Sequence, residues 1–129
     1  LNQIDVSNDV TQIKTRTAAA LQADETIDGL LAVGPHVCEA AWQAVEEVGA
    51  DVHLSCFDLS PGVMDLIEAG HVSFTIDQQQ RLQGYMPVIV LHLYNTNAGM
   101  LPGANVTSGP GFVDASNAAD VKSQAGVNR

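Results

Sequence analysis

Two short apolar runs separated by one helix-length segment constrain the fold of this chain most strongly. The runs are residues 52–57 (VHLSCF) and 72–76 (VSFTI), and each has the length of a buried β-strand. Between them, Ser60 can cap a helix and Gly70 can provide a left-handed stop, which predicts a helix over residues 61–69. Two strands joined through one helix pair in parallel, so this segment predicts an α/β fold.

Polar residues follow both of these strands directly. Asp58 comes after the first strand, and Asp77 and Gln78 come after the second. Ligands of open parallel sheets bind outside the carboxyl ends of the strands, and a carboxylate beside an amide suits the hydroxyls of a polyol. Spacing alone favours a second interpretation, in which Asp58 caps a turn and Gln78 is a solvated loop residue.

The other segments continue the alternation of strands and helices. Ser7, Asn8 or Asp9 can cap a first helix, and Gly49 can close a later one. We expect a helix from about residue 10, a strand over 29–33, a helix over 35–48, a helix over 79–94, a return segment over 106–113 and a short helical extension within 114–129.

Three motifs resemble one known family. They are FDLSP at 57–61, TIDQQ followed by LQGY across 75–85, and GPGFV at 109–113. The chain is similar, from about residue 10 to 113, to sugar-binding ABC transporter substrate-binding proteins of the ribose-binding type. The resemblance implies an α/β fold with a three-layer arrangement, a parallel sheet with helices on both faces, as in the flavodoxin-like lobe of a type I periplasmic binding protein.

The resemblance also implies site residues. Asp58 and Gln78 match the aspartate and glutamine that hydrogen-bond the sugar in this family, and Cys56 stands where the family has glycine. In the family, the turn after the preceding strand often carries an Asn-Asp pair, whereas this chain has Gly-Pro-His at 34–36. His36 is therefore a third candidate for a hydroxyl contact, or else a first-turn helix residue that faces water.

The family has two lobes with the ligand between them, and its chain crosses between the lobes three times. This chain would correspond to roughly the last 40–45% of such a protein, by the length expected for two domains. We expect residues 1–78 in the second lobe, 79–104 crossing to a mostly absent first lobe, 105–113 returning to the second lobe, and 114–129 as a C-terminal extension. The sequence starts at Leu1 instead of Met and shows no signal-peptide pattern, so we expect its start to be internal to a longer protein.

The resulting functional hypothesis is the solute-binding component of an ABC-type sugar uptake system, outside the cytoplasm. Its partners would be a small sugar and a membrane permease, and no bond would be made or broken. The alternatives are the effector domain of a LacI-type sugar-responsive regulator and a flavodoxin-like enzyme. With the first lobe absent, the apolar helix over 79–94 would lack its packing partner, which predicts either a companion fragment or self-association of the isolated chain.

Charge and motif content exclude several other classes. Fifteen acidic against five basic residues give a net charge of −10, which argues against nucleic acid as a partner. The four histidines show no metal-ligand spacing and no phosphate-binding glycine loop occurs, so we expect no metal and no cofactor.

The two cysteines, Cys38 and Cys56, lack any surrounding catalytic motif. A disulfide between them would fit an exported protein. We nevertheless expect two buried free thiols, because cysteine is among the most buried residue types and sequence gives no distance between the two.

Overall fold

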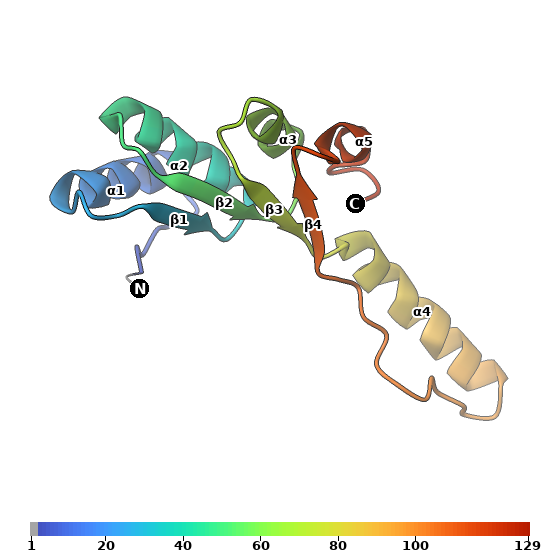
Figure 1. Cartoon of the computed structure of the whole chain (residues 1–129). Coiled ribbons are helices and arrows are strands. Elements are labelled where there is room, and N and C mark those ends of the chain that lie inside the picture. The colour runs from blue at the N-terminus through green and yellow to red at the C-terminus, as the bar shows by residue number, and fades with distance from the viewer. Residues whose placement is uncertain (1–2) are drawn as a thin grey trace.

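A computed structural model describes residues 3–129 and confirms the α/β class with a mostly parallel sheet (Figure 1). Helices and strands alternate from the first described element to the last, as the apolar runs predict for the middle of the chain. The elements are α1 Val10–Ala23, β1 Gly29–Ala32, α2 Pro35–Val48, β2 His53–Phe57, α3 Pro61–Glu68, β3 Phe74–Asp77, α4 Gln80–Thr96, β4 Gly111–Asp114 and α5 Ala118–Lys122. No helix of these residues is long and apolar enough to cross a bilayer.

The four strands lie in the order β1-β2-β3-β4. The first three are parallel, with Ala32 opposite Cys56 and Phe57 opposite Ile76. β4 instead runs antiparallel to β3, with Gly111 opposite Asp77. The reason is that the chain leaves the sheet at the carboxyl end of β3 and returns to that same end, so β4 enters in the opposite direction.

The helices around the sheet, α1, α2, α3 and α5, lie on one of its faces (Figure 1). Side chains that point to this face are buried, and Leu54, Cys56 and Val113 are at most 1% exposed. On the opposite face, Leu31 is 60% exposed and Phe112 is 58% exposed. The second helical layer implied by the family resemblance is therefore absent from residues 3–129, and the open face is apolar.

Helix boundaries follow the expected capping residues. The Asp9 carboxylate accepts a hydrogen bond from Gln12 N and caps α1, while Ser60 Oγ accepts from Val63 N and caps α3. Gly49 ends α2 with a left-handed φ of 71°, a conformation that glycine adopts without strain.

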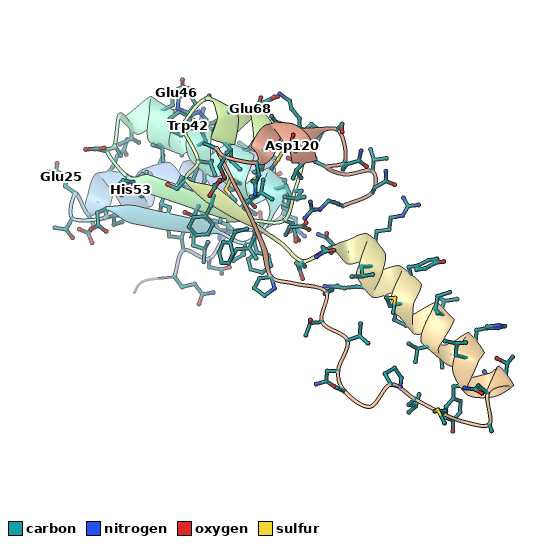
Figure 2. The ribbon with its side chains drawn as sticks, turned by 45° about the vertical axis from the view of Figure 1, so that its right-hand side comes forward. Glu25, Trp42, Glu46, His53, Glu68 and Asp120 are labelled. Atoms are coloured by element: carbon teal, nitrogen blue, oxygen red, sulfur yellow. A yellow bond between two sulfur atoms is a disulfide. The ribbon has the colours of Figure 1, made fainter. Side chains whose placement is uncertain are left out.

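α4 stands apart from the rest of the molecule. None of its residues is buried, and Figure 2 shows the helix and the following loop extending away from the sheet and the other helices. The helix extends two residues beyond the predicted residue 94, to Thr96. A 17-residue helix with an apolar surface and no buried residue needs a partner that residues 3–129 do not supply.

A disulfide joins Cys38 to Cys56, so the expectation of two free thiols is wrong. The first turn of α2 packs over β2, which brings the two Cα atoms to 5.8 Å, within the usual range for a disulfide. This proximity arises from tertiary packing across 18 residues of sequence and leaves no local sequence signal.

Candidate functional site

Asp58 leaves the carboxyl end of β2 with an unusual backbone conformation. Its φ is +67°, in the left-handed region that aspartate and asparagine tolerate better than most residues. Asp58 N donates to Ile76 O at 2.7 Å, and Thr75 Oγ1 donates to Asp58 O at 2.7 Å. Residues of β3 thus hold the Asp58 backbone at both its donor and its acceptor.

The structure brings Asp58 and Gln78 together, as the strand ends predict. Gln78 Nε2 donates to Asp58 Oδ2 at 2.9 Å. The other carboxylate oxygen, Asp58 Oδ1, is buried and has no hydrogen-bond partner among residues 3–129. Buried polar atoms of native proteins nearly always have a partner, and a carboxylate oxygen without one indicates a donor still to be supplied.

Asp77 does not join this pair at the sheet edge. Its side chain is fully buried, with Oδ1 accepting from Gln79 N at 2.7 Å and Oδ2 accepting from Arg129 Nε at 2.8 Å. Its structural role was not apparent from sequence, because Arg129 lies 52 residues further along the chain.

A hollow of about 160 Å³ lies beside Gln78. Its walls are Phe57, Ile76 and Gln78 on one side and residues 108–110 on the other, and the Gly109–Pro110 peptide bond is cis. A second, apolar groove of about 410 Å³ lies between α4 and residues 106–108. The return segment therefore forms a wall at the same sheet edge as Gln78. The GPGFV motif indicated this segment in the sequence, but it did not indicate that the segment lies beside Gln78.

His36 lies in the first turn of α2, exposed, after β1. Within residues 3–129 it makes no hydrogen bond to Asp58 or Gln78. Its role as a hydroxyl contact stays a prediction.

The basic side chains are all engaged away from Asp58. Asp65 and Glu68 bind Lys122 and raise the pKa of its ammonium group well above its ordinary value. Each of the five lysine and arginine side chains has a partner. Lys14 contacts Glu47, Arg16 contacts Asp5 O and Gln12, Arg81 contacts Val127 O and Asn128, Lys122 contacts Asp65 and Glu68, and Arg129 contacts Asp77. No described cation thus compensates the Asp58 carboxylate, and no described group of three or more His, Cys, Asp or Glu residues could hold a metal.

A lobe of this architecture, with polar side chains at the carboxyl ends of its strands, defines a ligand-binding α/β domain. Residues 2–97 match the family described as periplasmic binding protein domain, and the chain belongs to that family. Its members are substrate-binding proteins rather than enzymes.

Relatives with known structures or curated functions support this assignment. A carbohydrate transporter from Acidothermus cellulolyticus 11B, solved with myo-inositol, is 38% identical, with a TM-score of 0.83 over 91% of this chain and 41% of that one. The xylose/arabinose-binding protein XylF of Sulfolobus acidocaldarius is 33% identical over 69 residues, which are 54% of this chain and 17% of that protein. The arabinose-binding protein AraP of Geobacillus stearothermophilus, at 22% identity and a TM-score of 0.74, shows the shared fold. The chain spans less than half the length of each of these three proteins.

Proposed function

We propose that this chain is the C-terminal portion of the solute-binding component of an ABC-type sugar uptake system. It binds a monosaccharide or a related polyol in a cleft between two lobes, and the closed form is recognised by a membrane permease. Residues 1–78 and 105–113 belong to the second lobe, 79–104 cross to the first, and 114–129 extend the C-terminus.

The single observation that supports this function most is that Asp58 Oδ1 is buried without a hydrogen-bond partner in the described part of the chain. Gln78 already occupies Oδ2, which orients the carboxylate and leaves one oxygen to accept from a ligand hydroxyl. Gln78 also lines the hollow, so its carbonyl side can accept from a second hydroxyl. Small movements of these side chains would admit the ligand to the buried oxygen.

The charge distribution supports a neutral ligand. A sugar acid or a sugar phosphate would bring a negative charge to Asp58, and each described basic side chain is engaged elsewhere. Hydrogen bonds from neutral hydroxyls to a carboxylate carry no such repulsion.

The Cys38–Cys56 disulfide supports a location outside the cytoplasm, because disulfides persist mainly in oxidising compartments. It also favours the uptake protein over the effector domain of a transcriptional regulator, which would work in a reducing cytoplasm.

Isothermal titration of the complete protein with neutral pentoses, hexoses and inositols tests the proposal. We expect saturable binding of at least one compound, with no product by mass spectrometry. Asp58→Asn keeps the shape and tolerates the left-handed backbone, but removes the charge from a hydrogen bond, so affinity should fall by about tenfold to a hundredfold.

Asp51→Asn is the matched control, because Asp51 is exposed in the loop before β2, and it should leave affinity unchanged. The proposal is wrong if no neutral polyol binds, if a bound compound is converted to product, or if Asp58→Asn binds as tightly as the wild type.

A further inference from the structure

The C-terminal turn packs against the junction between β3 and α4. Gln124 O accepts from the backbone N–H groups of Val127, Asn128 and Arg129 at 2.9–3.0 Å, which closes a compact turn. From the start of α4, Arg81 Nη1 donates to Val127 O at 3.0 Å and to Asn128 Oδ1 at 2.7 Å. The backbone bonds to Gln124 O and the contacts from Arg81 together fix the position of the turn that carries Arg129.

Arg129 neutralises a carboxylate that has no access to water. Asp77 is 0% exposed, and its Oδ2 accepts from Arg129 Nε at 2.8 Å and Nη2 at 2.7 Å. A buried carboxylate costs free energy unless a cation and hydrogen-bond donors compensate it. The two contacts from Arg129 therefore compensate Asp77 and hold its side chain in place.

The second oxygen of Asp77 fixes the backbone of Gln79, the residue after Gln78. Oδ1 accepts from Gln79 N at 2.7 Å, and Gln79 has a left-handed φ of 54° immediately before α4 begins. Gln78 O accepts from Gln83 Nε2 at 3.0 Å. The Asp77 carboxylate thus connects Asp77 to Gln79, the residues on either side of Gln78. This hydrogen bond constrains the backbone of Gln78 and so the direction of the Gln78 side chain toward Asp58.

We propose that Arg129 is a positioning residue of the ligand site: it fixes Asp77, which fixes the Gln79 backbone and so aims Gln78 Nε2 at Asp58. The proposal rests on the proposed function, since Gln78 is its endpoint. Arg129 itself touches neither Asp58 nor the hollow.

Variants of the complete protein test this chain of contacts, with the polyol identified by titration as the probe. Arg129→Gln should weaken binding by about tenfold, the loss expected when a charge-assisted interaction no longer orders a ligand contact. Asp77→Asn/Arg129→Gln should recover most of the affinity, because the introduced amide oxygen still accepts from Gln79 N and the side chain carries no charge that needs a partner. Arg129→Lys should give an intermediate affinity, since it restores the charge but not the two-point geometry.

A double-mutant cycle separates positioning from general stabilisation. In a Gln78→Ala background, Arg129→Gln should have no further effect on affinity, because its endpoint is gone. Arg16→Gln is the control: Arg16 is exposed on α1 and its side chain donates to Asp5 O and Gln12 Oε1, far from Gln78 in sequence and fold, so affinity should not change. An Arg129→Gln loss that persists in the Gln78→Ala background, or no loss in the wild-type background, overturns the proposal.

A measurement without ligand distinguishes failure of the positioning role of Arg129 from failure of the proposed function. Arg129→Gln should shift the NMR signal of the Gln78 side-chain amide and speed hydrogen exchange at Gln79 N, and Asp77→Asn/Arg129→Gln should restore both. Unchanged Gln78 and Gln79 signals in a folded Arg129→Gln protein reject the positioning role, whatever the protein binds.

Discussion

Asp58 combines two features that each carry a free-energy cost in a folded protein. Its backbone is left-handed at a non-glycine residue, and one carboxylate oxygen is buried without a donor among the described residues. Both features occur at the sheet edge where ligands of α/β folds bind. Gln78 donates to the same carboxylate, so the pair has a defined geometry before any ligand arrives.

Gln78→Glu should make binding depend on pH. It places a second carboxyl group about where Nε2 lies, 2.9 Å from Asp58 Oδ2, and two carboxylates at that distance cannot both ionise easily. The pKa of the pair rises, so at high pH both groups are charged and repel, while below the raised pKa one proton is shared and replaces the lost donor. We expect weak binding at about pH 8 that strengthens toward about pH 5, measured by titration calorimetry beside the wild type. Equal affinity at both pH values would contradict the Gln78–Asp58 contact.

Gly109→Ala should destabilise the return segment. A Cβ at this position would lie 3.0 Å from Asp77 O and 3.3 Å from Gly111 N, and both are backbone atoms with little room to move. We expect a loss of about 1–3 kcal/mol in the free energy of unfolding, measured by urea denaturation. Gly103→Ala is the control, because nothing lies within 4 Å of its Cβ, and a similar loss there would refute the explanation.

At the scale of elements, the disulfide joins the first turn of α2 to β2 two residues before Asp58. The disulfide therefore fixes the end of β2, the strand that Asp58 follows directly.

Removing this link should lower stability substantially. For cysteines separated by 18 residues, the chain-entropy model gives about 3 kcal/mol. We expect this loss in the free energy of unfolding for Cys38→Ala/Cys56→Ala and for reduced wild type, with no effect of reductant on the double variant. A wild type whose stability does not change after verified reduction would contradict this prediction.

Elements set by local signals could be predicted from sequence, and contacts between distant residues could not. Asp9, Ser60 and Gly49 act on the next few residues of the chain, so they mark helix ends where the structure has them. The meeting of Asp58 and Gln78 also followed, because parallel strands end at one edge. The Asp77–Arg129 ion pair and the Cys38–Cys56 disulfide depend on how helices and the C-terminal turn pack, which no local pattern encodes. The antiparallel β4 depends on the path of α4 and its return, which lies outside any strand pattern.

Taken together, residues 3–129 leave two apolar surfaces uncovered. One is the sheet face that carries Leu31 and Phe112, and the other is α4 with its return loop. Because the chain spans 41% of its Acidothermus relative, residues of a longer protein are the expected cover for both.

The isolated 129-residue chain should therefore self-associate through α4. Val88 and Leu91 are 65% and 60% exposed one turn apart, and Val88→Glu/Leu91→Glu should shift the population toward the monomer in size-exclusion light scattering. Val10→Glu is the control, since Val10 is 50% exposed on α1, away from α4, and should leave the population unchanged. A wild-type chain that stays monomeric at high concentration would contradict this prediction.

The most direct test of the binding site is a crystal structure of the complete protein with the polyol that binds most tightly. We expect a ligand hydroxyl within hydrogen-bond distance of Asp58 Oδ1, at about 2.6–2.8 Å, with Gln78 in contact with the same ligand. A ligand bound elsewhere, or a first-lobe side chain that occupies Asp58 Oδ1 in its place, would show that Asp58 is not a ligand contact.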